Sequence, residues 1–411
     1  MSFSSILLNG RKVALEVSHS EVFKTEELLP LKWDAIRRKL LESGAEQRDR
    51  LVDITVAETG YSRVDSEEMV EGLLAFLEKF EPANYGSCTI RGALPDRSLT
   101  VSSQPIGTIL GICPQNAFAY LATVVALNGI AAGNRVVLRS SNRTPSIAEW
   151  LANLFEGIEG ISIISGSAED LLHAFCKSEG GGLFHYFGSS GRLPSLSKQC
   201  AKHGKIFLGD GEGNTWAFVD QSADPARAAS LLVAGAVRYN GETCTSVNGA
   251  IIHPDLYEEV KSHVLRLSPK SDYTLKHESQ IKMISKSRGH VLRDQGLVLI
   301  DRPRSDSRLV RQGIFGAALW LMPGDEALLR AMWLKNEYPL CFAFFGSTGG
   351  ERFCNLPNLA RLVINGDPSI EDPLEPWGGY GRSGTSRVEE WHYKYRRPLQ
   401  IDSPHPLNDA K

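Results

Sequence analysis

The chain has 411 residues, a formal net charge of −3, 42% hydrophobic residues and 23% charged residues. This length suffices for two or three domains, and the composition is that of an ordinary globular protein, neither disordered nor membrane-embedded. The nearly balanced charge provides no basic surface for nucleic acid, so we expect a small-molecule partner.

The N-terminus and the cysteines indicate a cytoplasmic protein. The first residues contain a short apolar run without a cationic lead or a small-residue cleavage pattern, so no signal peptide is predicted. No apolar stretch approaches the roughly 20 residues that a membrane helix needs. The seven cysteines are scattered without CxxC pairs or histidines at ligand spacing. This pattern argues against a disulfide framework and against a metal site.

Two helical stretches are expected near the start of the chain. Apolar residues at helical spacing over 34–59, with charged residues between them, predict one or two amphipathic helices. Gly44 is the candidate break in this stretch, and Gly60 is its expected end. A second helix is predicted over 66–80.

Strand patterns follow the two helical stretches. Residues 88–104 alternate apolar and polar side chains around Pro95-Asp96, which predicts a β-hairpin. From Gly107 onward, a strand, a loop and a helix follow one another repeatedly, and the strands read TILGICP, NRVVLRS, ISIISG and LFHYFGSS. This alternation predicts a parallel sheet covered by helices, in a doubly wound nucleotide-binding domain.

A second set of strands begins near Lys205 and reads KIFLG, TWAFVD, GAIIHP, LVLID and LWLM. These strands predict a second α/β domain. The tail EWHYKYRRPLQID predicts an extended strand that pairs with the sheet edge of another subunit.

One cysteine has surroundings suited to chemistry. Cys244 follows a polar, glycine-containing loop in YNGETCTSVNGAIIHP and precedes an apolar strand, so its sulfur is expected at the mouth of the second domain. A lone cysteine is more often a buried apolar side chain than a nucleophile. The segments around it therefore decide its interpretation.

Three separated segments resemble the aldehyde dehydrogenase superfamily, in the same order along the chain. They are GTILGICPQNAFAYLATVVALNGIAAGNRVVLRSSNRTPSIAEW, GDGEGNTWAFVDQSADPARAASLLVAGAVRYNGETCTS and INGDPSIEDPLEPWGGYGRSGTSR. The resemblance runs from about residue 34 to the end of the chain. Several ordered motifs are far more specific than a single glycine-rich loop. The resemblance implies an NAD(P)-dependent enzyme.

The resemblance assigns catalytic roles to two residues. Cys244 matches the nucleophile, which attacks the aldehyde carbon and retains the acyl group as a thioester after hydride departs. Asn116 in PQNAF matches the asparagine whose amide, together with the backbone N–H of the nucleophile, holds the developing oxyanion. Taken alone, Asn116 after Pro114 would equally suit a turn or a helix cap.

The resemblance also implies sites for NAD or NADP. Arg139, Ser140 and Asn142 match the strand end beside the adenosine ribose, where an Arg in place of the common lysine permits a 2′-phosphate. Gly166 matches a glycine near the adenine. The remaining cofactor residues match the helix start that meets the pyrophosphate and the ring that packs on the nicotinamide, and they are Gly188, Ser189 and Phe315.

Two departures from the family pattern concern lost glutamates. Counting back from Cys244, the glutamate that serves as general base in hydrolytic members falls on Asp210, with Glu212 close by. The run GDGEGN also partly resembles the CoA-acylating branch, in which a thiol takes the acyl group. In RQGIFGAALW, Gly313 occupies the place of the glutamate that holds the nicotinamide ribose, while Phe315 is retained.

The resemblance divides the chain into three parts. Residues 1–87 and 105–206 are expected to bind the dinucleotide, residues 207–390 to hold the nucleophile, and residues 88–104 and 391–411 to form oligomerisation strands. A homodimer or homotetramer is therefore expected.

Three functional hypotheses remain open. The first is an NAD(P)-dependent aldehyde dehydrogenase that works in the acylating or reductive direction, with CoA as acyl acceptor and an acyl thioester as partner. The second is a carboxylate-forming enzyme with Asp210 or Glu212 as base. The third is a protein that retains this fold for binding or structure without catalysis, because two glutamates are lost.

Overall fold

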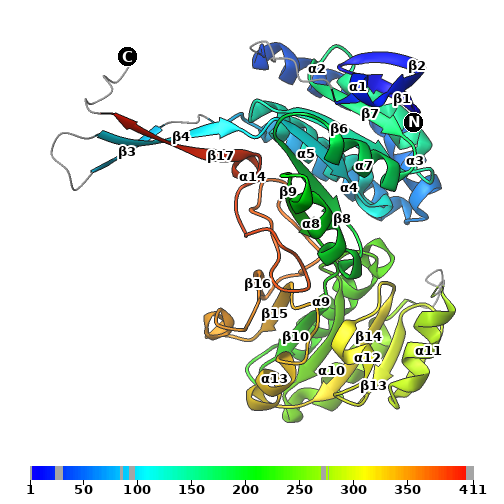
Figure 1. Cartoon of the computed structure of the whole chain (residues 1–411). Coiled ribbons are helices and arrows are strands. Elements are labelled where there is room, and N and C mark those ends of the chain that lie inside the picture. Colours follow the sequence, from blue (N-terminus) through cyan, green and yellow to red (C-terminus); the bar gives the residue numbers. More distant parts are fainter. Residues whose placement is uncertain are drawn as a thin grey trace.

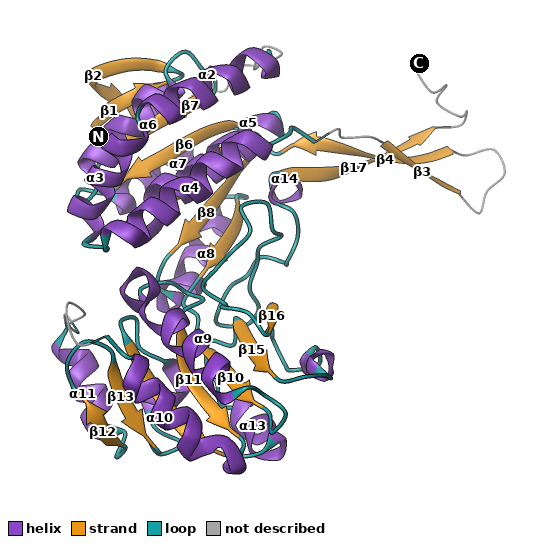
Figure 2. Cartoon of the chain, turned by 180° about the vertical axis from the view of Figure 1, so that it is seen from behind, coloured by secondary structure: helices purple, strands orange, loops and turns teal. Residues whose placement is uncertain are grey.

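The computed structural model of the chain describes residues 2–23, 31–83, 87–91, 98–269, 275 and 277–403. It has two α/β bodies and an arm of three strands that projects away from them (Figure 1). Each body is built on a seven-stranded sheet with helices packed against it (Figure 2). The predicted α/β class is confirmed.

The first body contains the sheet β2-β1-β7-β6-β5-β8-β9. Its last five members in this order are parallel, and its strands are β1 (Ser2–Leu8), β2 (Arg11–Ser18), β5 (Thr108–Ile112), β6 (Arg135–Ser140), β7 (Ile161–Ser165), β8 (Gly182–Phe187) and β9 (Ile206–Asp210). The helices that connect the parallel strands are α5 (Phe118–Ala131), α6 (Pro145–Phe155), α7 (Ala168–Lys177) and α8 (Leu193–Lys202). The order reverses between β5 and β8, so ligands are expected at the carboxyl ends of these two strands.

The strand KIFLG belongs to this first sheet, contrary to the prediction that it begins the second set. It forms β9, which pairs with β8 in parallel along its whole length. A short apolar strand carries no information about which neighbour it will pair with, since its pattern fits any buried parallel position. The strands of the second sheet therefore begin with TWAFVD, one strand later than predicted.

The early helices also differ from the prediction in where they break. The stretch contains α2 (Trp33–Glu46) and α3 (Arg48–Thr59), which separate at Gln47. Gly44 lies inside α2, where a side chain would come within 3.0 Å of Leu74 on α4 (Arg63–Lys79). The glycine thus permits close helix packing. Gly60 ends α3 with a φ of 76°, as predicted.

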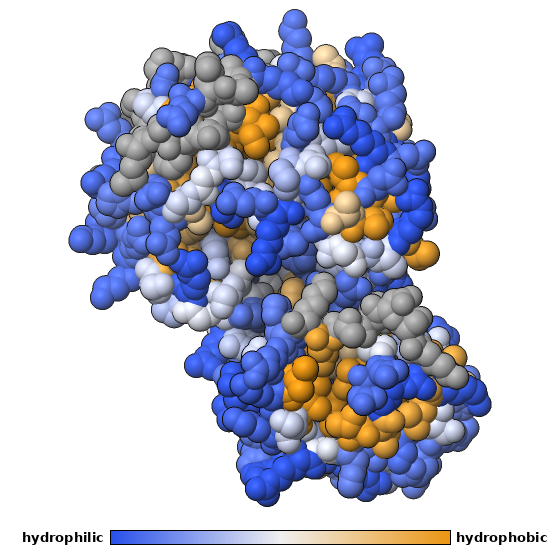
Figure 3. Space-filling view, turned by 90° about the vertical axis from the view of Figure 1, so that its right-hand side faces the viewer, coloured by the Kyte–Doolittle hydropathy of each residue, from blue (hydrophilic) through white to orange (hydrophobic). Residues whose placement is uncertain are grey.

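The second body contains the sheet β12-β13-β14-β11-β10-β15-β16. Its strands are β10 (Thr215–Val219), β11 (Val247–Ile252), β12 (His290–Arg293), β13 (Val298–Asp301), β14 (Ala318–Pro323), β15 (Cys341–Phe345) and β16 (Arg361–Ile364). Its helices are α9 (Pro225–Val237), α10 (Tyr257–Leu267), α11 (Glu278–Lys286), α12 (Arg308–Gln312) and α13 (Glu326–Trp333). A narrower waist joins the two bodies, and apolar residues gather on one face of the second (Figure 3).

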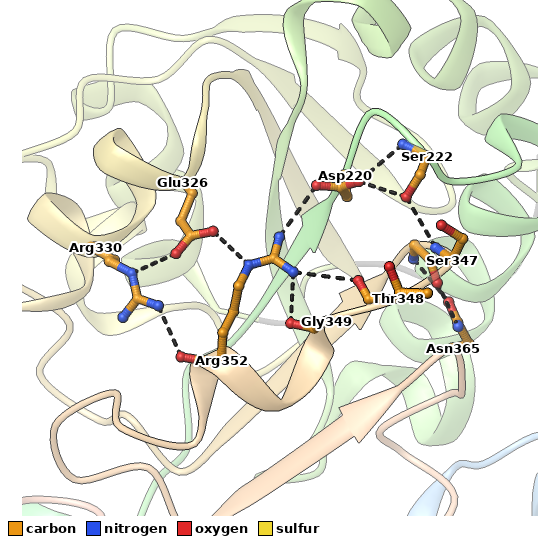
Figure 4. Close-up of polar contacts among 10 residues, drawn as sticks. Asp220, Ser222, Glu326, Arg330, Ser347, Thr348, Gly349, Arg352 and Asn365 are labelled. Carbon is orange, nitrogen blue, oxygen red and sulfur yellow. Dashed lines mark hydrogen bonds and ion pairs between the residues drawn. The ribbon is translucent and has the colours of Figure 1, made fainter.

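An ion-pair network around Arg352 connects one end of the second sheet to a neighbouring helix (Figure 4). The Arg352 guanidinium donates from Nε to Glu326 Oε2 at 2.6 Å and from Nη2 to Asp220 Oδ2 at 3.3 Å. It also lies over the rings of Phe344 and Phe353, at 5.0 and 4.8 Å from their centroids. One side chain therefore links the ends of β10 and β15 to α13.

The projecting arm consists of β3 (Ser87–Arg91), β4 (Ser98–Pro105) and β17 (Arg396–Ser403). The predicted hairpin is confirmed as the pair β3 and β4, although its Pro95-Asp96 turn lies outside the described residues. β17 pairs antiparallel with β4 along its full length.

The tail begins as the short helix α14 (Trp391–Lys394), so the strand predicted from Glu390 starts only at Arg396. Trp391 and Tyr395 pack into the core of the first body, with 8% and 0% exposure. One helical turn directs residues four apart to the same side, which an extended strand would not do.

Candidate active site

A cavity of about 460 Å³ opens between the two bodies, beyond the carboxyl ends of β5 and β8. Loops from both bodies and the segment before α14 form its walls. It brings together most of the residues predicted for the site, namely Asn116, Gly188, Ser189, Asp210, Glu212, Cys244 and Phe315. The region therefore matches the place where ligands bind in doubly wound sheets.

Cys244 is presented to the cavity by a loop with unusual backbone geometry. Tyr239, Asn240 and Gly241 have φ values of 53°, 58° and 66° in succession. Left-handed conformations at non-glycine residues cost of order 1–3 kcal/mol and persist only where the surroundings hold them. This turn connects α9 to the strand β11 and places the sulfur between them, facing the cavity.

The local charge opposes ionisation of this thiol. Burial raises the pKa of Cys244 well above its usual value, and the carboxylates of Glu371 and Asp210 raise it further. The sulfur is therefore protonated in this state, and a group in the cavity must accept its proton before it acts as a nucleophile.

Asn116 lies at the end of β5, in the turn η1 (Gln115–Ala117) before α5. Its Nδ2 donates to the backbone carbonyl of Glu242 at 2.6 Å. This bond fixes the amide beside the loop that carries Cys244, two residues away. The amide can thus polarise a carbonyl held at the sulfur.

The glycine-rich run after β9 packs closely against Cys244 and Ser190. A side chain at Gly213 would come within 1.9 Å of the Cys244 carbonyl, and one at Gly211 would come within 2.1 Å of Ser190 Oγ. The Gly211 N–H also donates to the Ser383 carbonyl at 2.8 Å. Glycine is required here because three backbone segments meet around the nucleophile.

Asp210 is buried beneath the cavity, in a hydrogen-bonded network. Its Oδ2 bonds to His185 Nε2 at 2.6 Å, and its Oδ1 accepts from Ser386 Oγ at 2.8 Å. His185 Nδ1 in turn bonds to the Tyr395 hydroxyl at 2.9 Å. Both carboxylate oxygens are therefore engaged in joining β8, β9 and the C-terminal segment.

Glu212 also lines the cavity and binds the backbone at the start of the helical segment after β8. Its Oε2 accepts from the Ser190 N–H at 2.5 Å, while the Glu212 N–H donates to Ser190 Oγ at 2.9 Å. Gly188 and Ser189, predicted to open the pyrophosphate site, immediately precede this contact. The Glu212 carboxylate therefore binds a backbone N–H that is suited to binding an anion.

The adenosine-side residues lie along the same edge of the sheet, outside the cavity. Arg139 and Ser140 end β6, and Arg139 Nε donates to the Gly166 carbonyl at 3.2 Å. Gly166 follows β7 with a φ of 152°, and Asn142 is exposed in the next loop. The structure therefore gathers these four residues at the carboxyl ends of neighbouring strands.

An aromatic ring in the cavity wall is suited to pack on a flat ligand. Phe315 lines the cavity and is 49% exposed, so its ring is free to pack against a flat ligand. Gly313, two residues earlier, has a φ of 73°, and a side chain there would lie 2.7 Å from Asn214 Oδ1 and 2.8 Å from Asn248 Oδ1. The backbone conformation and the close neighbours therefore disfavour the family glutamate, or any other side chain, at position 313.

Sequence reasoning missed a carboxylate that shares the cavity with Cys244. Glu371 lies after β16, and its Oε1 accepts from Thr245 Oγ1 at 2.9 Å. Burial raises the pKa of Glu371 to about 7, although the positive charge of Arg361 opposes the rise. The segment INGDPSIEDPLEPWGG contains several acidic residues, but nothing in their spacing indicates which of them approaches Cys244.

Within the described ranges, no group of three or more His, Cys, Asp and Glu side chains is arranged to hold a metal ion. None of the helices in this part of the chain combines the length and the apolar character needed to cross a membrane.

The family model described as "Aldehyde dehydrogenase family" matches residues 21–288. An alpha-ketoglutarate semialdehyde dehydrogenase from Haloferax volcanii is 26% identical over 395 residues, which span 86% of this chain and 82% of that protein. A glutarate-semialdehyde dehydrogenase from Pseudomonas aeruginosa is 29% identical over 388 residues, with coverage of 85% and 80%.

Solved structures show the same fold. An NADP-dependent enzyme from E. coli superposes with a TM-score of 0.84 at 21% identity, covering 98% of this chain and 94% of that one. A glyceraldehyde-3-phosphate dehydrogenase from Methanocaldococcus jannaschii in complex with NADP gives a TM-score of 0.79 at 18% identity, with coverage of 90% and 88%.

Proposed function

The chain belongs to the aldehyde dehydrogenase family, and from that premise we propose that it oxidises an aldehyde with NAD or NADP through an acyl group held on Cys244. The observation that supports this most directly is the shared cavity, in which the Cys244 sulfur, the Asn116 amide and the Phe315 ring meet. These are a nucleophile, an oxyanion donor and a surface for a flat ring.

The residues at the sheet edge fit a dinucleotide. Arg139, Ser140, Asn142 and Gly166 would hold the adenosine end, and Gly188 and Ser189 would hold the pyrophosphate. A side chain at Gly188 would come within 2.5 Å of the Tyr186 hydroxyl, so the backbone stays open to a close approach. A bound nicotinamide supplies the hydride acceptor.

The chain's own groups carry out the remaining steps. Cys244 loses its proton to water in the cavity, which passes it to solvent, and the sulfur attacks the aldehyde carbon, while Asn116 Nδ2 shifts from the Glu242 carbonyl to the developing oxyanion. Loss of hydride leaves a thioester on Cys244. An oxyanion donor of this kind contributes roughly 2.7–4 kcal/mol to the barrier reduction.

The cavity walls favour a neutral or apolar aldehyde. Of the described residues that line the cavity, none is basic, and five are carboxylates: Asp210, Glu212, Glu371, Asp372 and Glu375. Aromatic and aliphatic side chains complete the walls, among them Tyr120, Leu121 and Trp377. An aldehyde with a carboxylate tail would meet like charge here, whereas an alkyl tail would be buried against apolar surface.

A pair of substrates of matched length tests this proposal. With the wild-type chain, we expect NADH or NADPH absorbance to rise with pentanal, at a kcat/KM at least about tenfold above that for succinate semialdehyde. Cys244→Ala should abolish the signal. Equal rates in wild type and Cys244→Ala would contradict the mechanism, and a preference for succinate semialdehyde would contradict the substrate class. Product analysis with and without CoA distinguishes a carboxylic acid from an acyl-CoA product.

The arm is proposed as the contact between subunits. It projects away from both bodies (Figure 2), and β17 lies at the edge of its sheet. A strand at the edge of a sheet can pair on its open side with a strand of a second copy. A chain that ends at Tyr395 should elute as a monomer where the full chain elutes as a dimer or tetramer; unchanged elution would contradict this role.

A further inference from the structure

We propose that Glu371 is the general base that activates water against the acyl group on Cys244. The chain would then take its deacylating base from the segment between β16 and α14, and not from the strand end that precedes the nucleophile. This inference rests on the proposed function, because it requires a thioester on Cys244.

The Glu371 carboxylate is fixed beside the nucleophile by the adjoining residue. Thr245 directly follows Cys244 and is fully buried, and its Oγ1 donates to Glu371 Oε1 at 2.9 Å. Thr243 Oγ1 lies 3.4 Å from Thr245 Oγ1 and 2.7 Å from Ser246 Oγ, so hydroxyl groups surround the anchoring point. The second oxygen, Oε2, accepts no hydrogen bond from any described residue and remains available to water in the cavity.

Hydrogen bonds from Arg361 hold the turn that carries Glu371. Arg361 on β16 donates to the carbonyls of Pro368 at 2.6 Å and Ile370 at 2.8 Å, and to Glu375 Oε2 at 3.2 Å. These bonds fix the backbone on the N-terminal side of Glu371. Arg361 is thus a positioning residue, and it stabilises the ionised carboxylate that a base requires.

The other cavity carboxylates have different tasks. Asp210 is bound through both oxygens to His185 and Ser386, and Glu212 is bound to the Ser190 N–H. Asp372 caps its own turn by accepting from the Leu374 N–H at 2.9 Å, and Glu375 pairs with Arg361. Glu371 alone in this set has one oxygen anchored next to the nucleophile and one facing the cavity.

The groups around Glu371 adjust its proton affinity to this role. Burial raises its pKa to about 7, the negative charge of Glu375 raises it too, and Arg361 and the Thr245 hydroxyl lower it. The remaining titratable neighbours in electrostatic contact with it are protonated at neutral pH and come from other elements: Tyr120, Tyr239, Cys244 and Cys341. A base with a pKa near the working pH is the most effective one.

The step balances without a further reactant. A water oxygen attacks the thioester carbon while Glu371 takes one of the water protons, and Asn116 holds the oxyanion. The C–S bond then breaks, and the carboxylic acid leaves. The proton passes from Glu371 to the Cys244 sulfur, which restores the thiol and the carboxylate.

Pre-steady-state kinetics with pentanal and the preferred cofactor test the assignment. For Glu371→Gln, we expect a burst of about one NAD(P)H per subunit at the wild-type rate, then a steady rate lower by roughly 100-fold or more. The wild-type kcat should rise with pH through about 7, and the Gln variant should be flat there. Hydroxylamine, which attacks without a base, should restore turnover and yield the hydroxamate. Glu371→Asp should retain part of the steady rate.

Other outcomes overturn the assignment. If Glu371→Gln slows the burst and the steady phase equally, the residue acts before the thioester forms. If its steady rate stays close to that of wild type, another group activates water. Glu351→Gln, an exposed carboxylate on η5 (Gly350–Phe353), is the control for loss of charge and should leave both phases unchanged. If the wild type itself produces no NAD(P)H, the proposed function fails, and the assignment fails with it.

Discussion

Replacement of Glu371 by Gln should stabilise the protein at alkaline pH and have little effect at acidic pH. Burial raises the pKa of this carboxyl from 4.5 to about 7. Below pH 4.5 the group is protonated in the folded and unfolded chain, so its ionisation costs nothing. Between pH 4.5 and about 7 the unfolded chain loses this proton while the folded chain still holds it, so stability falls across this range and levels off above it.

The magnitude follows from the two pKa values. At about 1.4 kcal/mol for each pKa unit, the rise corresponds to roughly 3 kcal/mol. Gln keeps an acceptor for Thr245 Oγ1 and carries no charge. The free energy of unfolding of Glu371→Gln should therefore exceed that of wild type by up to about 3 kcal/mol at pH 8, and the difference should vanish towards pH 4.5.

Urea unfolding followed by tryptophan fluorescence, in steps between pH 5 and pH 8, measures this difference. Glu351→Gln is the matched control, because its carboxylate is exposed and its replacement should leave the free energy of unfolding almost unchanged. A constant difference for Glu371→Gln across this range, or a variant that loses stability relative to wild type as pH rises, would refute the reasoning.

Three further substitutions test other parts of the account. Gly313→Glu restores the family residue at a backbone φ of 73°, with neighbours at 2.7 Å, so we expect a lower Tm and no tighter cofactor binding; a stable variant that binds NADPH more tightly would be inconsistent with this. Glu212→Ala frees the Ser190 N–H for an anion, so calorimetry should show the Kd of the cofactor falling by about two- to fivefold, whereas an unchanged or higher Kd would argue against a shared site. Arg352→Ala removes the ion pairs with Glu326 and Asp220, and the free energy of unfolding should fall by about 2 kcal/mol while kcat/KM is retained; Arg352→Lys should recover only part of the loss, and a stable Ala variant would show that the network contributes little.

The sequence predicted four strands of the first sheet, β5 to β8, because each of them is separated from the helix that follows it by Gly, Pro or Asn. It could not assign β9 to a sheet, since the pairing of β9 with β8 depends on the turn made by the intervening helix α8. The break at Gln47 was missed for a similar reason. Gly44 weakens a helix locally, but its packing against Leu74 makes it favourable there.

Ordered motifs indicated some of the candidate site residues, whereas contacts between distant segments could not be predicted from the sequence. Cys244, Asn116 and Phe315 line one cavity, and their roles stay predictions. The contact between Thr245 and Glu371 spans 126 residues and depends on the turn that Arg361 holds. Likewise, nothing in the run GDGEGN reveals that Glu212 binds the backbone of Ser190, because that contact exists only once β8 and β9 are paired.

Mass spectrometry of the protein quenched during turnover tests the central claim most directly. With pentanal and cofactor, Glu371→Gln should accumulate a species in which an acyl group replaces the thiol hydrogen, and peptide mapping should locate that group on Cys244. The Cys244→Ala variant should show no such species. An acyl group on another residue, or NAD(P)H formation with no covalent species at any quench time, would contradict the account.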